Sequence, residues 1–253
     1  LVVGTTGTGK TALIDSLLTS NLDESYTSFY LYFSAQTTSH KTQEIIESKL
    51  KHWTKTKMIP DANKKAVVFI DDLNMPRKEK FGAQPPLELI RQFIDYEGWY
   101  DRQHLDIFKQ ILEVQIIAAM GPPGGGRAEI SQRLQSKFNV INFTFPSDAQ
   151  VRRIFQSILA NHFLSMEFDE EIRPLAEPLA AATINLYKTI QENLMPTPAK
   201  PHYVFNMRDI SKIIQGVCQV DKYYCDTKLS LFRLWVHESM RVFYDRMINE
   251  EDR

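Results

Sequence analysis

The sequence predicts an α/β protein in which a parallel sheet flanked by helices is followed by an all-α domain. Short apolar segments of strand character alternate with helical segments as far as about residue 146. Strands separated by helices usually pair in parallel, with the helices on the faces of the sheet. Beyond that point no convincing strand pattern remains. We therefore expect two domains, residues 1–146 and residues 147–253.

The strands of the first domain are predicted from short apolar runs, several of them rich in β-branched or aromatic residues. They are Leu1–Val3, Ser28–Ala35, Ala66–Ile70, Glu113–Ala119 and Val140–Phe145. Helices are predicted from apolar residues at helical spacing, over Lys10–Leu18, Thr38–Thr54 and Leu87–Tyr96. The second of these helices would bury one face made of Ile45, Ile46, Leu50 and Trp53.

The second domain is predicted to contain only helices. Ser147-Asp148 can cap a helix that runs through Leu164. Further helical stretches are expected over Glu170–Asn193, Asn206–Tyr223 and Lys228–Asn249. The first of these is expected to be interrupted near Pro174 and Pro178. The prolines of Met195–Pro201 indicate a stiff linker.

Composition limits the possible classes of function. The formal net charge is −1, from 30 Lys and Arg against 31 Asp and Glu, so the basic excess of a nucleic-acid-binding protein is missing. No apolar run approaches the roughly 20 residues of a membrane helix. Cys218 and Cys225 lack partners at zinc spacing and are interpreted as reduced thiols. Because the strongest motif begins at Gly4, we expect a fragment cut from a longer polypeptide.

This motif is Gly4-Thr5-Thr6-Gly7-Thr8-Gly9-Lys10-Thr11, which matches the P-loop pattern. Its glycines let backbone N–H groups point at phosphate oxygens, and the following helix adds its positive end. Lys10 is expected to place a charge between the β- and γ-phosphates of ATP, and Thr11 to offer its hydroxyl to Mg²⁺. A glycine-rich turn without a ligand is the alternative interpretation.

A second motif is the apolar strand that ends in two acids, Val67-Val68-Phe69-Ile70-Asp71-Asp72. Ligands of parallel sheets bind at the carboxyl ends of the strands. Asp71 is therefore expected to hold Mg²⁺ through water. Asp72 is expected to act as a general base or to position water. A solvated pair of acids that opens a turn is the alternative.

Six segments carry a resemblance to a known family. They are Phe69–Pro76, Gly82–Pro86, Gly98–Asp101, Ala118–Arg127, Tyr203–Asp209 and Leu234–Glu238. Taken in this order they resemble dynein heavy chains, and most closely the third AAA+ module of the motor ring in the axonemal branch. The resemblance covers essentially the whole chain. It implies a P-loop AAA+ large domain followed by a helical small domain, the lid.

The resemblance also implies a function. The module would sit in a ring of six unequal modules within one heavy chain, where the first module performs the main hydrolysis. The third would bind ATP or ADP with Mg²⁺ and gate the coupling to microtubule release. Its partners would be the neighbouring modules and, indirectly, microtubules, with no nucleic acid and no membrane. The expected location is cytoplasmic and cytoskeletal, in the axoneme of a cilium or flagellum.

Two arginines acquire roles from the resemblance. Arg208 matches the sensor-2 arginine, which reaches from the lid to the γ-phosphate; the alternative is a helix-start arginine paired with Asp209. Arg133 lies near the position that faces the preceding module's nucleotide, but Ser136 stands where the family has a second arginine. A solvated helix arginine is therefore the preferred interpretation of Arg133.

Two departures from the family pattern predict slow turnover. Asp72 stands where many AAA+ proteins have Glu, and misplacing a catalytic group by about 1 Å can cost around a hundredfold in rate. Gly121 stands where a polar sensor-1 residue, usually Asn, is expected. Hence a regulatory ATPase is favoured, and a module that holds nucleotide without hydrolysis is the alternative. A spacer with an empty pocket is disfavoured by the intact Gly9-Lys10-Thr11.

The remaining features are assigned to structure. Trp53 and Trp235 are predicted to be core residues on amphipathic helices, and Trp99 to lie in a turn where it contacts a neighbouring module. Gly121–Gly126 is interpreted as a flexible loop. The six histidines form no close pair at metal spacing, so no metal other than magnesium is assigned.

Overall fold

The computed structural model describes residues 1–61 and 64–252. These residues form two compact units with the boundary between Phe145 and Pro146. Each unit has a hydrophobic core of its own. The predicted α/β fold class is confirmed. The predicted second domain extends to Arg253, which lies outside the described residues.

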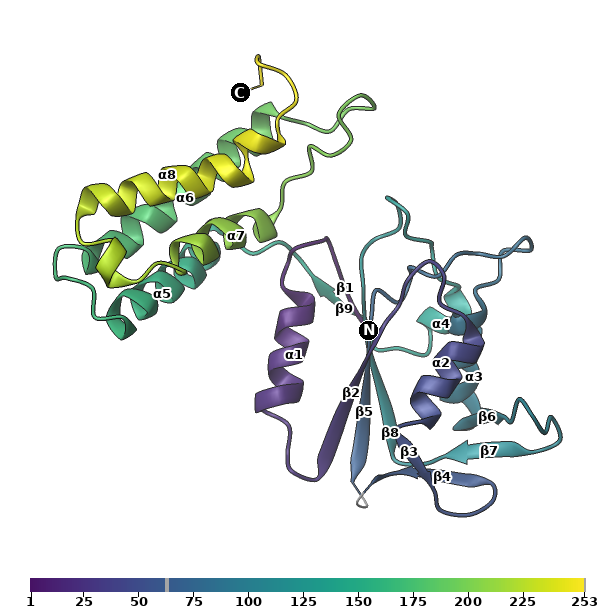
Figure 1. Cartoon of the computed structure of the whole chain (residues 1–253). Coiled ribbons are helices and arrows are strands. Elements are labelled where there is room, and N and C mark those ends of the chain that lie inside the picture. Colours follow the sequence, from purple (N-terminus) through teal and green to yellow (C-terminus); the bar gives the residue numbers. More distant parts are fainter. Residues whose placement is uncertain (62–63, 253) are drawn as a thin grey trace. The chain divides into compact units, whose positions relative to one another are not determined.

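The first unit is built on a parallel sheet (Figure 1). In spatial order its strands are β2 (Tyr26–Tyr32), β5 (Lys65–Asp71), β8 (Val114–Met120), β1 (Val2–Gly4) and β9 (Ile141–Phe143). Val3 lies opposite Met120 on one side and Asn142 on the other. The strand order reverses at β1, so the loop after β1 starts at the switch point where such sheets bind ligands.

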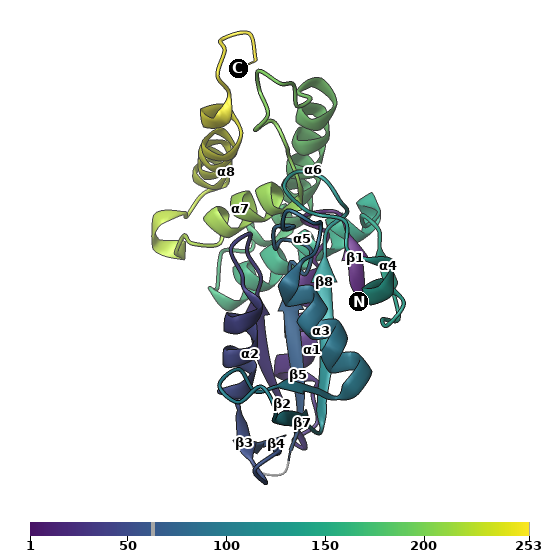
Figure 2. The ribbon, with the colours of Figure 1, turned by 90° about the vertical axis from the view of Figure 1, so that its right-hand side faces the viewer.

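Helices cover both faces of this sheet. On one face lies α1 (Lys10–Ser20), and on the other lie α2 (Ser39–Glu47), α3 (Pro85–Tyr96) and α4 (Gln132–Gln135) (Figure 1). In Figure 2, α2 and α3 lie in front of the sheet. Successive side chains of a strand point to opposite faces. Accordingly, Phe69 packs in the cluster with Ile14 of α1, whereas Val68 and Ile70 belong to the cluster that includes residues of α2 and α3.

A second, smaller sheet was not predicted. It contains β3 (Leu50–His52), β4 (Lys57–Pro60), β7 (Phe108–Ile111) and β6 (Gly98–Tyr100), in this order. The predicted helix Thr38–Thr54 is therefore wrong beyond Glu47. Residues 50–52 pair antiparallel with residues 58–60, so their backbone groups bond across a hairpin. Trp53, predicted to be buried, is 62% exposed.

The prediction of a turn around Trp99 is also corrected. Trp99 lies in β6 and is 1% exposed. Its ring lies 5.7 Å from the Phe93 ring, and its indole N–H donates to Glu47 Oε1 at 2.8 Å. Trp99 is therefore a core residue of this unit, with its polar atom satisfied inside the unit, and it is not a contact for a neighbouring module.

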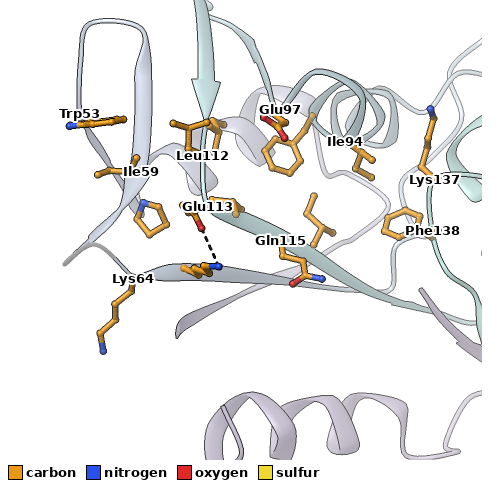
Figure 3. Close-up of a pocket in the computed structure, with 16 residues that line it drawn as sticks. Trp53, Ile59, Lys64, Ile94, Glu97, Leu112, Glu113, Gln115, Lys137 and Phe138 are labelled. Carbon is orange, nitrogen blue, oxygen red and sulfur yellow. Dashed lines mark ion pairs between the residues drawn. The ribbon is translucent and has the colours of Figure 1, made fainter. Parts of the chain in front are cut away.

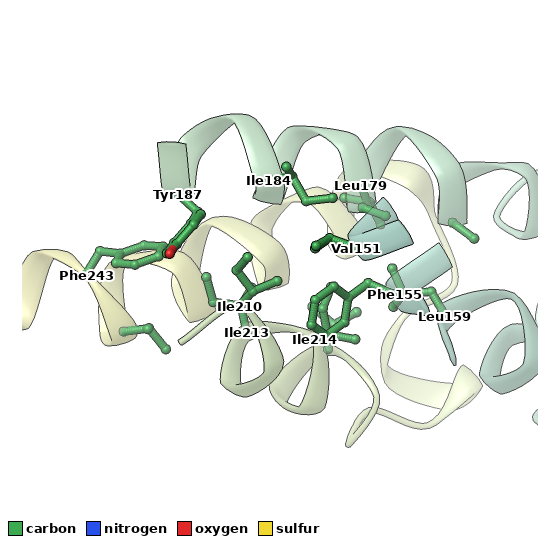
Figure 4. Close-up of a cluster of buried hydrophobic side chains, with 14 of the residues drawn as sticks. Val151, Phe155, Leu159, Leu179, Ile184, Tyr187, Ile210, Ile213, Ile214 and Phe243 are labelled. Carbon is green, nitrogen blue, oxygen red and sulfur yellow. The ribbon is translucent and has the colours of Figure 1, made fainter. Parts of the chain in front are cut away.

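The second unit consists of helices around one core (Figure 4). They are α5 (Asp148–Ser165), α6 (Ala176–Asn193), α7 (Met207–Val217) and α8 (Lys228–Val242), with the 3₁₀ turns η2 (Arg173–Leu175), η3 (Lys222–Tyr224) and η4 (Tyr244–Arg246). Buried residues of α7 recur at helical spacing, namely Ile210, Ile213, Ile214 and Val217.

Two predicted helix ends and one predicted interruption in this unit differ from the structure. The helix predicted to end at Tyr223 ends at Val217, and the one predicted to end at Asn249 ends at Val242. Pro178 lies within the first turn of α6, where a missing N–H costs no intrahelical bond, so it does not interrupt that helix. Trp235 of α8 packs partly buried against the core, as predicted, and its indole donates to Thr183 Oγ1 at 2.9 Å.

Candidate nucleotide-binding site

The glycine-rich loop lies between β1 and α1. Gly7 and Gly9 have φ angles of 85° and 88°, in the left-handed region that residues with a Cβ seldom adopt. Gly9 is also the N-cap of α1. The first backbone N–H groups of a helix have no partner within it. The loop therefore leads directly into a helix end that favours anions.

Lys10 is buried at the start of α1, with 9% of its surface exposed. Its ammonium donates to the carbonyl oxygens of Gly4 and Thr5, each at 2.8 Å, and to the hydroxyl of Thr8 at 3.5 Å. Bonds from a charged donor are stronger than neutral ones. The positive charge is thus held at the loop by the loop's own backbone, at the place where a phosphate-binding role requires it.

Thr11 and Asp71 meet although 60 residues separate them, because the Thr11 hydroxyl donates to Asp71 Oδ2 at 2.9 Å. The other carboxylate oxygen of Asp71 accepts from the backbone N–H of Asp72 at 3.0 Å. Hydroxyl and carboxylate oxygens are the ligands that Mg²⁺ prefers. The two side chains therefore fit the magnesium site that was predicted for them.

Asp72 follows directly after β5 with a φ of 53°, a left-handed conformation that Asp tolerates better than most residues. The next amide, that of Leu73, donates to the carbonyl of Ala119 in β8 at 3.0 Å. This bond anchors the turn to the neighbouring strand. The Asp72 side chain is 43% exposed, and its Oδ1 lies 3.4 Å from Nη2 of Arg127.

Sequence reasoning assigned no role to Arg127, although it ends one of the six segments that carry the resemblance. The loop before it, predicted to be flexible, closes as a turn in which the backbones of Gly124 and Arg127 exchange two hydrogen bonds of 3.0 Å. At the start of that loop, the amide of the fully buried Asn74 donates to the carbonyl of Gly121 at 2.8 Å. An arginine directly after a glycine run, close to the end of a strand, was the signal available in the sequence.

Arg208 is exposed in the first turn of α7, within the helical unit. The carboxylate of the neighbouring Asp209 is 3% exposed and lies 3.3 Å from both Lys212 and Arg246. The ion pairs of Asp209 thus involve Lys212 and Arg246 rather than Arg208. The sensor-2 role of Arg208 stays a prediction.

Arg133 is exposed on α4, and Ser136 is the C-cap of that short helix. Exposure agrees with the interpretation of Arg133 as a solvated helix arginine. Neither position belongs to the group formed by the loop, Thr11 and Asp71. A role for Arg133 toward another module's nucleotide has no support from these contacts.

A cavity of about 960 Å³ lies elsewhere in this unit, against the first residues of β5 and β8 (Figure 3). Its lining includes Trp53, Lys65, Ile94 and Gln115, and no residue of the glycine-rich loop. The loop follows the carboxyl end of β1, so cavity and loop lie at opposite ends of the parallel strands. The cavity is therefore separate from the candidate site.

Residues 1–61 and 64–252 contain no cluster of three or more His, Cys, Asp or Glu side chains that could ligate a metal. Within the same residues, none of the helices has the length and apolar character needed to cross a membrane.

Comparison with known proteins identifies relatives for both units. Residues 1–146 match the family described as the P-loop containing dynein motor region, and residues 154–253 match the dynein heavy chain ATPase lid domain. The chain is 48% identical over 252 residues to dynein axonemal heavy chain 2 of Mus musculus. It is 47% identical over 253 residues to the dynein-1-beta heavy chain of the flagellar inner arm I1 complex of Chlamydomonas reinhardtii. The whole chain is covered in both comparisons, but it spans only 6% of the length of either relative.

Proposed function

Because the chain belongs to the dynein heavy chain family, we propose that it is an ATP-binding AAA+ module of an axonemal dynein motor. Its site would hold ATP or ADP with magnesium, hydrolyse ATP slowly and regulate the motor. We assign it to the third module of the ring. This assignment is supported by the six ordered segments from Phe69 to Glu238.

The observation that carries the proposal is the contact between Thr11 and Asp71, 2.9 Å long and next to the buried Lys10. It unites a hydroxyl, a carboxylate and an ammonium at the end of β1. Lys10 and the loop amides would bind the phosphates, while Thr11 and Asp71 would hold the magnesium ion. Bound there, the metal would neutralise charge on the phosphates. Asp72 would orient the attacking water.

Slow hydrolysis is supported by two residues of the site. The carboxylate of Asp72 sits on a side chain one methylene shorter than that of Glu, and small misplacements are costly in rate. Gly121 has no side chain with which to orient water. Because hydrolysis at such a site would be slow, bound ATP would stay in place for longer before it is converted to ADP and phosphate. Retention is the property that a regulatory module requires.

The partners follow from membership of a motor ring. Neighbouring AAA+ modules of the same heavy chain would contact this one, and microtubules would be affected through the whole motor. The relatives named above include axonemal and flagellar heavy chains. We therefore propose a cytoplasmic, cytoskeletal protein of the ciliary or flagellar axoneme. We also propose that Arg208 of its lid contacts the γ-phosphate.

The test is single-turnover ATP hydrolysis in the full-length protein, with Lys10→Ala compared with Lys49→Ala. Lys49 is an exposed lysine of the same unit and serves as the matched control. Loss of one charge-assisted hydrogen bond of about 1.5–3 kcal/mol weakens binding roughly 10- to 200-fold. We expect Lys10→Ala to remove nucleotide retained at this site and Lys49→Ala to leave it unchanged. Equal retention in both variants would overturn the proposal.

The second candidate is a nucleotide-binding module without hydrolysis, which is favoured by the departures from the family pattern at Asp72 and Gly121. Asp72→Asn separates the two. It keeps the size of the side chain and removes the charge, so it should slow phosphate release if Asp72 orients water. Retained nucleotide with no phosphate release in the parent protein, unchanged in Asp72→Asn, would favour binding alone.

A further inference from the structure

Arg127 reaches Asp72 through the space that a side chain on Gly121 would fill. A Cβ built on Gly121 would lie 2.8 Å from Nε, 2.9 Å from Cδ and 3.2 Å from Cζ of Arg127. Distances below 3.0 Å require displacement of one partner, because real Cβ atoms do not approach so closely. The arginine therefore depends on glycine at the position where the family pattern has a polar side chain.

The backbone on both sides of this contact is held in place. Around Asp72, the Leu73 amide bonds to Ala119 at 3.0 Å and the Met75 amide to Asp72 at 2.9 Å. Around Arg127, the backbone pairs with Gly124, and the amide of Ala128 donates to the carbonyl of Asn74 at 2.9 Å. Only the side chains remain to be oriented. The Arg127 bond uses Oδ1 of Asp72, at 3.4 Å.

The guanidinium is largely shielded from solvent. The Arg127 side chain is 24% exposed, and its Nε is buried without a hydrogen-bond partner among the described residues. A buried N–H without a partner is unfavourable for the folded state, and such groups concentrate at functional sites. The position of Arg127 is thus set by packing over Gly121, and the more exposed Asp72 adjusts to it.

On this basis, and resting on the proposed function, we propose that Arg127 is a positioning residue for hydrolysis. It holds the Asp72 carboxylate where water is activated and takes the place of the polar side chain that Gly121 lacks. Arg127 touches Asp72 and acts through it. Glycine at position 121 is then required so that the Arg127 side chain can reach Asp72.

The opposite possibility is that Arg127 holds Asp72 away from water and slows the reaction. The direction of the rate change in Arg127→Ala decides between the two. An ion pair as exposed as this one shifts an equilibrium by no more than about fivefold, so either effect on the rate has that upper limit. A slower reaction in Arg127→Ala supports positioning, and a faster one supports inhibition.

The experiment compares Arg127→Ala, Arg127→Lys and Gly121→Ala in the full-length protein. Gly121→Ala keeps the arginine but places a methyl group in its path, so it should act like Arg127→Ala. We expect both to lower the Lys10-dependent single-turnover rate by about three- to fivefold, the upper range for an ion pair of this exposure. Nucleotide affinity should stay within about twofold, because neither residue lies in the phosphate loop. Arg127→Lys, which keeps the charge without the planar fork, should fall between.

Two further measurements separate positioning from a general structural role. In an Asp72→Asn background, Arg127→Ala should change the rate by less than about twofold, because residues that act through each other are not additive. In nucleotide-free structures of Arg127→Ala and Gly121→Ala, the Asp72 side chain should leave the conformation that faces residue 127. The control is Arg77→Ala. Arg77 is an exposed arginine that, like Asp72, follows β5, and its substitution should change neither the rate nor the conformation of Asp72.

The outcomes are distinct. If Lys10→Ala leaves nucleotide retention and turnover at this site unchanged, the proposed function fails and takes this inference with it. If Lys10→Ala abolishes both, but Arg127→Ala and Gly121→Ala turn over at the parent rate or faster, only the positioning role is wrong. Additive effects with Asp72→Asn would also overturn the role of Arg127, since the arginine would then act independently.

Discussion

Replacing Lys109 by Met should destabilise the first unit by removing the cation that joins α2 to the second sheet. Lys109, in β7, lies 2.8 Å from Glu47 at the end of α2 and 2.8 Å from Asp101 after β6. The lysine is 12% exposed, and the two carboxylates are 20% and 16% exposed. Met keeps an aliphatic stem of similar length, so the substitution removes charge with little change in packing.

The magnitude follows from the pair with Glu47. Breaking a buried ion pair by removing one partner costs about 3–5 kcal/mol. Glu47 keeps its hydrogen bonds from Gln43 and Trp99, each of 2.8 Å, and the pair is partly solvated. We therefore expect a loss of about 2 kcal/mol in the free energy of unfolding, which lowers the melting temperature by about 4–8 °C.

The dependence on pH has a definite sign. Burial is the largest influence on Glu47 and raises its pKa, but the hydrogen bonds from Lys109, Gln43 and Trp99 outweigh it, so the pKa of Glu47 lies below its ordinary value. The bond from Lys109 also lowers the pKa of Asp101. Carboxyls with a lowered pKa stabilise the fold above their unfolded values near pH 4 and lose this contribution as pH falls through the folded values.

The assay is urea unfolding followed by circular dichroism between pH 3 and pH 8. The difference between the parent and Lys109→Met should be constant above about pH 5 and shrink below about pH 4. Lys65→Met is the control, because the pair Lys65–Glu113 spans 3.7 Å with both side chains more than half exposed, and it should cost under about 0.5 kcal/mol. Equal losses for both variants, or a difference that grows in acid, would refute the reasoning.

Three further predictions concern the helical unit. Trp235→Phe removes the 2.9 Å bond to the fully buried Thr183 and should cost about 1 kcal/mol in urea unfolding; no change would mean that this bond is not formed in solution. Arg246→Met leaves the carboxylate of Asp209, 3% exposed, with a single cation at its side, and should cost about 2–3 kcal/mol by the same measurement, whereas a stabilised variant would contradict the pairing. Burial raises the pKa of the Cys225 thiol, so alkylation at pH 7 should be at least about tenfold slower in the folded chain than in urea, and equal rates would show that the thiol is accessible.

The order of strands and helices was well predicted where an element is long enough for its pattern of apolar residues to be visible in consecutive positions. The strand Ala66–Ile70 is apolar throughout because helices cover both faces of the sheet, and the structure places it within Lys65–Asp71. The prediction failed at the hairpin that follows α2. Leu50 is buried there, as a helix would also have required. Apolar spacing alone indicates that two residues are buried. It does not tell whether both lie on one helix or whether the second lies on a strand.

The residues of the candidate site were predicted one by one, but their contacts were not. A P-loop pattern identifies Lys10 and Thr11 because all the residues of the motif lie within eight consecutive positions. The meeting of Thr11 with Asp71 joins positions 60 residues apart. It depends on the order of β1, β8 and β5 in the sheet. That order is decided by the packing of the whole unit.

The sequence by itself therefore determined the residue types of a nucleotide site, the positions of the acids at a strand end and the change from an α/β to a helical part. Only the tertiary structure decided that Trp99 is a buried residue of a second sheet and that Arg127 passes over Gly121 to Asp72, 55 residues away. The physical reason is the range of the interactions. Local conformation and periodicity are encoded in adjacent residues, whereas contacts between distant side chains depend on strand order, register and the space left free by neighbours.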